Sequence, residues 1–276
     1  MPFHLQTYGL MPKKQGNSLR GEKAMSRIAP FEENTIVVGD CLGIIKNLPN
    51  SCIDLIVTDP PYNVSQKGVN ISRGALFGQG GPIKLDFGDW DYSSIVPMDY
   101  LDEFIRLLTP VGVLVLFYDK LYLGMIGLYL EMKFGFQTRH IGSYVKTNPA
   151  PQARKVKWQN GVENFLVATK NKGIGHHFNY KLGQSPDYFI RSVNYERIHP
   201  TQKPEDLIEW IVSYWSFEGD LVFDSFIGSG TTAIAADRLG RKFFGCDINS
   251  SYVEMALNRL ANDRLKRSQL GLFSDG

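Results

Sequence analysis

The sequence predicts an α/β fold in which a mostly parallel, twisted sheet is covered by helices on both faces. Short apolar runs alternate with segments of helical spacing, and a Gly-rich turn joins a strand to a helix near the C-terminus. We expect strands at 35–38, 53–58, 111–118, 163–170, 220–224 and 242–247. We expect helices to begin at Cys41, Pro97, Pro204, Thr231 and Ser250.

The length and composition favour one domain with an insertion. The chain has 276 residues and is 43% hydrophobic, which is enough for one substantial core. Residues 1–34 are polar and aperiodic, so they are expected to form an N-terminal extension or a loosely docked arm. The main domain is expected at 35–263 and a C-terminal tail at 264–276. Two irregular stretches interrupt the main domain: a Gly-rich loop at 64–92 and a segment at about 146–203.

The formal net charge of +2 conceals an uneven distribution. Between residues 139 and 203, 11 Lys and Arg residues stand against three acids, a balance of +8, which leaves −6 for the rest of the chain. Aromatic residues are interleaved with these cations, a composition suited to nucleic acid, because cations bind phosphates and aromatic faces stack on bases. The charge alone also fits a solvated loop region.

The cysteine content and hydropathy exclude several classes of protein. Cys41, Cys52 and Cys246 form no CxxC pair, so neither a disulfide framework nor a zinc site is expected, and His176, His177 and His199 are expected to be structural. No apolar stretch approaches the length of about 20 residues that crosses a bilayer. The sequence therefore predicts a soluble cytoplasmic protein.

The stretch "TDPPYN" at 58–63, which we call the acceptor corner, directly follows an apolar strand. Two consecutive prolines cannot donate hydrogen bonds to a sheet, so the chain must leave the strand at Asp59. The corner therefore places a carboxylate, a rigid turn and an aromatic side chain at a strand end.

The stretch "SFIGSG" at 225–230, which we call the cofactor turn, lies between a strand ending at Asp224 and a helix opening with Thr231. Gly228 and Gly230 allow a ligand to approach the backbone, and the helix N-terminus can face an electronegative group. Asp247 ends the next strand, where a carboxylate can bind a ribose. This arrangement is typical of a site for an adenosine-type cofactor, although a purely structural glycine turn would have the same pattern.

The residues that the turn lacks narrow the choice of cofactor. No Lys follows Gly230, so the turn is not a P-loop, and Ala233 stands where a dinucleotide fingerprint requires its third glycine. The carboxylate of Asp224 would repel a pyrophosphate but suits a ligand with an amino group and a sulfonium. The sequence therefore favours S-adenosylmethionine.

Together, "TDPPYN", "HPTQKP" at 199–204, "DSFIGSGTT" and "GCDIN" resemble the motifs of the amino-group DNA methyltransferases. Their order along the chain is similar to that of the beta-order N6-adenine methyltransferases, and the resemblance spans about 35–263. It implies a Rossmann-like methyltransferase fold in which 64–92 is the active-site loop and 146–203 is the target-recognition insertion. Relatives often have Pro where this chain has Ser225, and residues 1–34 have no counterpart.

The resemblance implies roles for the acceptor corner that the chemistry also requires. Asp59 and the carbonyl of Pro60 would accept the two N6 hydrogens of adenine and direct its lone pair to the methyl group, while Pro61 keeps the corner rigid. Tyr62 would stack on a base flipped out of the duplex, with Asn63 as a further polar contact.

The resemblance also implies the residues that bind the cofactor. Asp40 would bind the adenine amine, Asp247 and Asn249 the ribose, and Lys203 with Thr201 the methionine carboxylate. The remaining expected cofactor residues are Asp224, Phe226, Gly228, Ser229, Gly230 and Thr231. In the loop, Asp89 and Trp90 match a short signature of relatives.

Several alternatives to site-specific methylation of adenine in duplex DNA stay open at this point. Cytosine-N4 transfer uses the same geometry, although such relatives usually carry Ser in place of Asp59, and adenine in RNA presents the same edge. Ring-carbon methylation requires a cysteine nucleophile, typically after proline, and none of the three cysteines follows one. A non-enzymatic nucleic-acid-binding module or a nicotinamide-dependent oxidoreductase would not need all these motifs together. The expected partners are double-stranded DNA, a restriction endonuclease and, if the protein is not a monomer, a second copy of the chain, with DNA binding placing it at the nucleoid.

Overall fold

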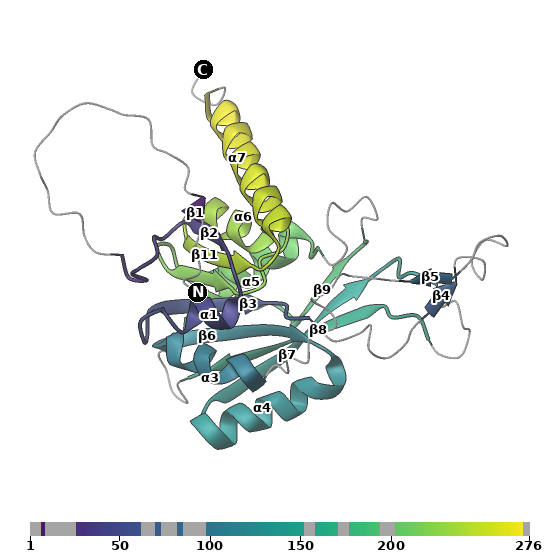
Figure 1. Cartoon of the computed structure of the whole chain (residues 1–276). Coiled ribbons are helices and arrows are strands. Elements are labelled where there is room, and N and C mark those ends of the chain that lie inside the picture. Colours follow the sequence, from purple (N-terminus) through teal and green to yellow (C-terminus); the bar gives the residue numbers. More distant parts are fainter. Residues whose placement is uncertain are drawn as a thin grey trace, which may run out of the picture.

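The fold is built around a nine-stranded sheet (Figure 1). The computed structural model describes residues 7–8, 26–61, 70–72, 82–84, 98–151, 158–170, 177–193 and 202–272. The strand order is β1-β2-β11-β10-β3-β6-β8-β7-β9. The strands are β1 (Thr7–Tyr8), β2 (Thr35–Val38), β3 (Ile53–Thr58), β6 (Leu108–Tyr118), β7 (Gln137–Lys146), β8 (Val162–Thr169), β9 (Tyr188–Arg191), β10 (Leu221–Asp224) and β11 (Lys242–Asp247).

The five central strands β2, β11, β10, β3 and β6 are mutually parallel. Beyond them, β8 pairs antiparallel with both β6 and β7, whereas β9 pairs parallel with β7. A separate two-stranded sheet consists of β4 (Asn70–Ser72) and β5 (Pro82–Lys84). The predicted α/β class with a mostly parallel sheet is confirmed.

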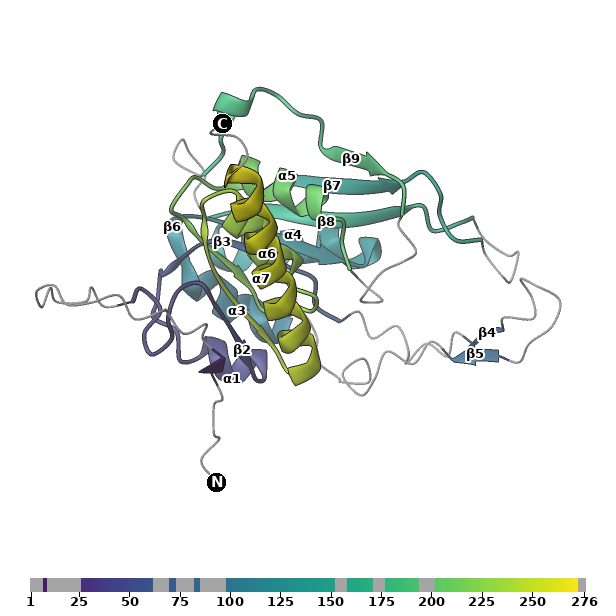
Figure 2. The same ribbon diagram turned by 90° about the horizontal axis from the view of Figure 1, so that it is seen from above.

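Helices cover both faces of the sheet (Figure 2). One face packs against α1 (Cys41–Ile45), α3 (Met98–Leu107) and α4 (Lys120–Phe134), and the other against α5 (Glu205–Trp215), α6 (Thr231–Arg238) and α7 (Ser250–Leu272). Along β3, Ile53 and Ile56 enter the first core, whereas Leu55 and Val57 enter the second. Side chains alternate from Leu55 to Val57, and a register shift between Ile53 and Leu55 places Ile53 on the same face as Ile56, so one apolar run supplies both cores.

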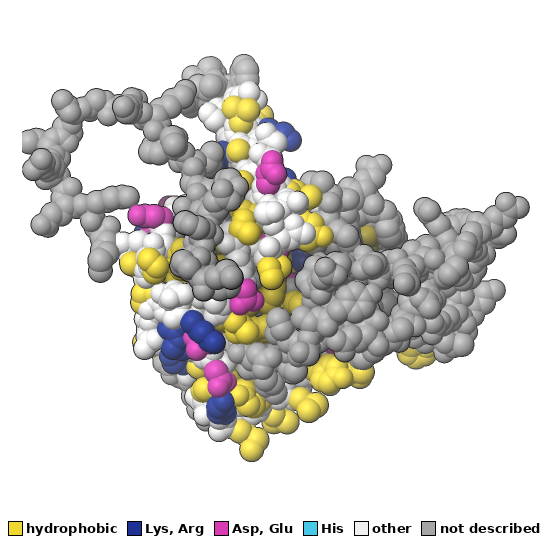
Figure 3. All heavy atoms as spheres, in the orientation of Figure 1, with side chains coloured by type: hydrophobic (Ala, Val, Ile, Leu, Met, Phe, Trp, Pro, Cys, Tyr) yellow, Lys and Arg dark blue, Asp and Glu magenta, His cyan; other side chains and the backbone are white. Residues whose placement is uncertain are grey.

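The sequence analysis missed α4 and β7. Residues of α4 are apolar on all sides: Leu123, Ile126 and Leu130 are buried, whereas Leu121 and Met132 are 72% and 85% exposed. A helix without a polar face shows no 3.6-residue period, so its pattern did not predict a helix. Its exposed apolar side chains account for hydrophobic surface at the lower end of Figure 3.

Parts of the expected extension and tail pack on the main body. Ile28 and Phe31 are buried in the first core, and Arg27 pairs at 2.9 Å with the buried Asp54 of β3. At the other end, α7 continues to Leu272, and Arg264 pairs with Asp237 of α6. Residues on both sides of the expected limits of 35 and 263 therefore contact the main body through core packing and ion pairs.

The topology places several acidic residues at one edge of the sheet. Strands β2, β3, β10 and β11 run in the same direction, so their carboxyl ends lie together. Each of these ends carries or is closely followed by an aspartate, namely Asp40, Asp59, Asp224 and Asp247.

Among the described helices, none is long and apolar enough to span a membrane.

Candidate active site

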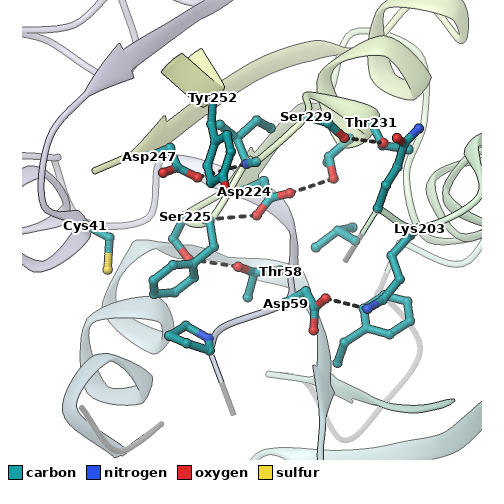
Figure 4. A pocket seen from close by; sticks show the side chains of 18 of the residues that line it. Cys41, Thr58, Asp59, Lys203, Asp224, Ser225, Ser229, Thr231, Asp247 and Tyr252 are labelled. Atoms are coloured by element: carbon teal, nitrogen blue, oxygen red, sulfur yellow. Dashed lines mark hydrogen bonds and ion pairs between the residues drawn. The ribbon is translucent and has the colours of Figure 1, made fainter. Parts of the chain in front are cut away.

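A cavity of about 170 Å³ opens at this edge of the sheet (Figure 4). Residues far apart in sequence line it: the acceptor corner contributes Asp59 and Pro61, the cofactor turn contributes Ser225 to Ser229, and Lys203 precedes α5. The structure thus brings the two sequence motifs to one cavity. Of the expected site residues, Asp40, Asp59, Pro61, Lys203, Asp224, Phe226, Gly228, Ser229, Thr231 and Asp247 line it.

Asp247 is fixed at the mouth of the cavity by two backbone amides. Its Oδ2 accepts from the N–H of Gly228 at 3.0 Å, and its Oδ1 accepts from the N–H of Asn249 at 2.9 Å. Burial raises the pKa of Asp247, and these two hydrogen bonds lower it in part. The carboxylate at the end of β11 is therefore tied directly to the cofactor turn.

Asp224 lies deeper, at the end of β10. Its Oδ2 accepts from Thr232 Oγ1 at 2.7 Å and its Oδ1 from the N–H of Phe226 at 3.1 Å. Burial raises the pKa of Asp224 to about 7, against the hydrogen bonds that lower it. No described cation pairs with Asp224, so this carboxyl can meet a positive charge on a ligand at a low desolvation cost.

Gly230 and Asn249 do not line the cavity. Each has a structural role instead. Gly230 has φ of 82°, and a Cβ there would lie 2.7 Å from Cβ of Ala256 on α7. Only glycine allows this turn and this approach of the helix. Asn249 accepts from the N–H of Ser251 at 2.9 Å and so caps the start of α7.

The acceptor corner is described as far as Pro61. Thr58, the last residue of β3, is hydrogen-bonded through Oγ1 to Ser225 Oγ at 2.9 Å. Asp59 and Pro61 then face the cavity, whereas Pro60 is not among its lining residues. Tyr62 and Asn63, together with Asp89 and Trp90 of the loop, lie outside the described residues, so their expected roles stay predictions.

Lys203 enters the cavity from the segment before α5. Its ammonium pairs with Oδ2 of Asp59 and, at 3.1 Å, with Oε2 of Glu163 on β8. Burial alone lowers the pKa of Lys203, but Asp59 and Glu163 outweigh it and raise the pKa above its usual value. The expected contact of Lys203 with a methionine carboxylate stays a prediction, as does that of Thr201, which lies outside the described residues.

The sequence analysis missed several residues of the site. Tyr252 and Ile248 follow the β11 aspartate and line the cavity, and Gln202 has a buried Oε1 that accepts no hydrogen bond from the described residues. Cys41 also lines it, but burial first, and then Asp40 and Asp247, raise the pKa of its thiol to about 12. Such a thiol is a poor nucleophile. An apolar residue directly after a strand-ending acid is common, so the sequence offered no distinctive signal for Ile248.

The aromatic residues of the insertion divide into two groups. Phe178 and Phe189 are half-buried and pack against the second core, where the ring centroid of Phe178 lies 4.8 Å from that of Trp215 and the centroid of Phe189 lies 5.7 Å from that of Trp210. Trp158 is 96% exposed, and Tyr180 and Tyr188 are also exposed. The expectation that all these rings are available to nucleic acid is therefore wrong for Phe178 and Phe189, because they fill the space above α5. Several expected residues lie outside the described residues, namely Arg154, Lys155, Lys157, His176, Tyr195 and His199. His177 is described, and its Nδ1 is hydrogen-bonded to Oδ2 of Asp220 at 2.6 Å.

The cavity suits S-adenosylmethionine. Asp224 is buried and pairs with no cation among the described residues, so it matches a ligand that carries an ammonium and a sulfonium, and Asp247 in the cavity wall matches ribose hydroxyls. Gly228, with φ of 48°, leaves the backbone of the turn open to close approach. A mostly parallel α/β sheet that carries this set of acids and the glycine turn at its carboxyl edge is typical of S-adenosylmethionine-dependent methyltransferases.

Comparisons with known proteins identify the family within this class. The chain belongs to the N6/N4 DNA methylase family, whose model, described as DNA methylase, matches residues 53–258. It is 33% identical over 249 residues to the Type II methyltransferase M2.LlaDCHI of Lactococcus lactis subsp. cremoris, covering 83% of this chain and 90% of that protein. It is also 33% identical over 244 residues to the Type II methyltransferase M2.DpnII of Streptococcus pneumoniae, covering 82% and 88%.

A solved structure agrees with the family assignment. The crystal structure of the M1.HpyAVI–SAM complex is similar to this chain with a TM-score of 0.63 and 27% identity, covering 81% of this chain and 98% of that one. The resemblance to N6-adenine DNA methyltransferases is thereby confirmed. The protein is an S-adenosylmethionine-dependent DNA methyltransferase.

Proposed function

We propose that this methyltransferase modifies the exocyclic N6 of adenine at specific sites in duplex DNA, with Asp59 as the residue that receives the amine. The observation that carries the proposal is the position of Asp59 in the cavity it shares with the expected cofactor residues Asp224 and Asp247. A carboxylate there can accept hydrogen bonds from an amine, whereas a serine would be the weaker acceptor.

The chemistry divides between the cofactor and the chain. S-adenosylmethionine supplies an electrophilic methyl group on a positively charged sulfur. Asp59, together with the carbonyl of Pro60, accepts the N6 hydrogens and so draws the nitrogen lone pair out of conjugation with the ring. The double proline holds that carbonyl in place, and Tyr62 offers a stacking surface for the flipped base. The amine nitrogen would lose one proton to solvent as the N–C bond forms and the S–C bond breaks, which would leave the sulfur as the uncharged thioether of S-adenosylhomocysteine.

Residues from several elements would hold the cofactor. Asp247 would bind the ribose, Asp40 the adenine amine, and Asp224 the positive end of the methionine part. The turn residues Phe226, Gly228 and Ser229 would line its pocket. Thr231 at the start of α6 adds a hydroxyl to the same wall.

Product analysis tests the choice of base. The protein methylates duplex DNA with radiolabelled cofactor, and the DNA is then digested to nucleosides. We expect the label in the deoxynucleoside of N6-methyladenine. Label in N4-methylcytidine would overturn the assignment. Asp59→Ala is expected to abolish transfer while cofactor binding stays measurable, and full activity in this variant would remove Asp59 from the mechanism.

The basic segment around residues 152–157 is proposed to bind the DNA backbone. Reversing the charge of Arg154, Lys155 and Lys157 is expected to weaken DNA binding and to reduce the slope of log K against log salt by roughly one for each phosphate that is no longer neutralised. An unchanged slope would assign these cations to solvent.

A restriction endonuclease is a further proposed partner, supported by the Type II designation of both curated relatives. Its test is whether host DNA without this methylation is cut by an endonuclease of the same cell. The sequence leaves monomer and homodimer open, and sedimentation velocity distinguishes them.

A further inference from the structure

Four side chains of alternating charge form a continuous series from the sheet to the acceptor corner. Lys146 on β7 pairs with Oε1 of Glu163 on β8, and Glu163 Oε2 lies 3.1 Å from the ammonium of Lys203. The same ammonium pairs with Oδ2 of Asp59. Lys203 is thus shared between two carboxylates, one on the sheet and one in the corner.

Glu163 is held between two lysines within the series. It lies near the start of β8 with Tyr144 of β7 as its cross-strand neighbour, and pairing of β8 with β6 begins at the next residue, Asn164. Its side chain is 24% exposed. Burial would raise the pKa of Glu163, but Lys203 and Lys146 outweigh it and hold the pKa at about 2. The carboxylate is therefore ionised across the physiological range.

Lys203 is confined between these partners. Its side chain is 12% exposed, and its ammonium lies 5.0 Å from the centre of the Phe117 ring on β6. A buried ammonium takes the position at which its attractions to the surrounding anions balance each other. With Glu163 on one side and Asp59 on the other, that position is fixed by the sheet.

We infer that Glu163 is a positioning residue for methyl transfer, which acts through Lys203 to orient the carboxylate of Asp59 toward the amine. The inference rests on the proposed function of Asp59. Lys203 binds Oδ2 of Asp59 and so sets the angle at which the carboxylate meets the N6 hydrogens. Glu163 also shares the positive charge of Lys203, so that Asp59 is held in place and yet stays a strong hydrogen-bond acceptor.

Without Glu163, both effects fail together. The ammonium of Lys203 would be balanced by Asp59 alone and would move toward it, which turns the carboxylate and makes it a weaker acceptor for the amine. A misplacement of about 1 Å at a reacting group can cost roughly a hundredfold in rate. Neither effect changes the affinity of the cofactor turn for S-adenosylmethionine.

The test compares Glu163→Gln with the matched control Glu131→Gln, which changes an exposed glutamate on α4. We expect the single-turnover rate of adenine methylation to fall about ten- to hundredfold in Glu163→Gln, while the Kd values for S-adenosylmethionine and DNA stay within about twofold of the control. A rate equal to that of the control would overturn the inference. So would a weakened cofactor Kd with an unchanged rate, because it would place Lys203 on the cofactor instead.

A second variant separates positioning from stability. Glu163→Gln leaves Lys146 as a buried cation without its partner, which destabilises the fold. The double variant Lys146→Met with Glu163→Gln removes both charges, so we expect it to regain thermal stability but not the methylation rate. Recovery of the rate together with stability would show that Glu163 is merely structural, and the double variant decides the question even if the single variant does not fold.

The wild-type protein distinguishes this inference from the proposed function. If wild-type protein forms no N6-methyladenine, the proposed function is wrong. If it forms N6-methyladenine and Glu163→Gln does so at the control rate, the proposed function stands and the inference alone is wrong.

Discussion

Thr58 Oγ1 and Ser225 Oγ lie 2.9 Å apart in the interior, and this hydrogen bond joins the acceptor corner to the cofactor turn. Thr58 is the last residue of β3 and Ser225 directly follows β10, which pairs parallel with β3. The bond therefore helps to fix the distance between the proposed methyl donor and acceptor sites.

This bond can be measured with a double-mutant cycle. Thr58→Val and Ser225→Ala are each expected to lower the free energy of unfolding by about 1–2 kcal/mol, because each leaves a buried hydroxyl without its partner. The double variant should cost less than the sum, with a coupling energy of roughly 0.5–1.5 kcal/mol from urea unfolding. Additive losses would show that the two hydroxyls do not interact.

Asp224 predicts a pH dependence of stability. Burial raises its pKa to about 7 from the ordinary value near 3.8, so the folded protein binds this proton more tightly than the unfolded chain does. The stabilising contribution is full below about pH 4 and is lost as the pH rises through about 7. Without cofactor, the wild type is therefore expected to lose stability between pH 5 and 8 by roughly a few kcal/mol more than Asp224→Asn does.

The cofactor should reverse this trend. A ligand with an ammonium and a sulfonium favours the ionised form of Asp224, so S-adenosylmethionine is expected to bind the wild type more tightly at pH 8 than at pH 6. Asp224→Asn should bind it weakly and with little pH dependence. Equal pH profiles for the two proteins, measured by calorimetry, would argue against contact between Asp224 and the cationic part of the ligand.

Two glycines have a similar backbone conformation but different surroundings. Comparing alanine substitutions at the two positions therefore separates the cost of backbone strain from the cost of a steric clash. Gly230 and Gly219 have φ of 82° and 84°, but a Cβ at Gly219 meets open space, whereas one at Gly230 meets Ala256 at 2.7 Å. Gly219→Ala is expected to cost about 1 kcal/mol from backbone strain alone. Gly230→Ala should cost at least about 2 kcal/mol more and should also weaken cofactor binding, because α7 or the turn must move. Equal unfolding free energies for the two variants would contradict the packing role of Gly230.

The aromatic residues of the insertion should fall into two functional groups. Trp158 is 96% exposed, so Trp158→Ala is expected to leave thermal stability unchanged and to weaken DNA binding by about 1–3 kcal/mol if its ring stacks on a base. Phe178 is half-buried and packs against Trp215, so Phe178→Ala should lower stability by about 1–2 kcal/mol. Titration of labelled duplex and thermal melting check both expectations. Unaltered DNA affinity in Trp158→Ala would assign that ring to solvent.

The residues of the site were largely predictable because each follows a strand-ending signal. The double proline after Asp59, the glycines after Asp224 and the acid at Asp247 stand out in the sequence, and the structure brings them to one cavity. Gln202, Ile248 and Tyr252 carry no such signal, since polar and apolar residues next to a motif are common. Likewise α4 was missed because its apolar residues surround the whole helix.

By itself, the sequence determined the parallel α/β architecture, the cofactor class and the acidic residues at the strand ends, because local spacing and turn chemistry encode all three. Only the tertiary structure showed that Glu163, in the strand expected at 163–170, reaches Asp59 through Lys203. These three residues are brought together by pairing of β8 beside β6 and by the approach of the segment before α5. Such long-range contacts between oppositely charged side chains leave no periodic trace in a sequence, so only the folded chain reveals them.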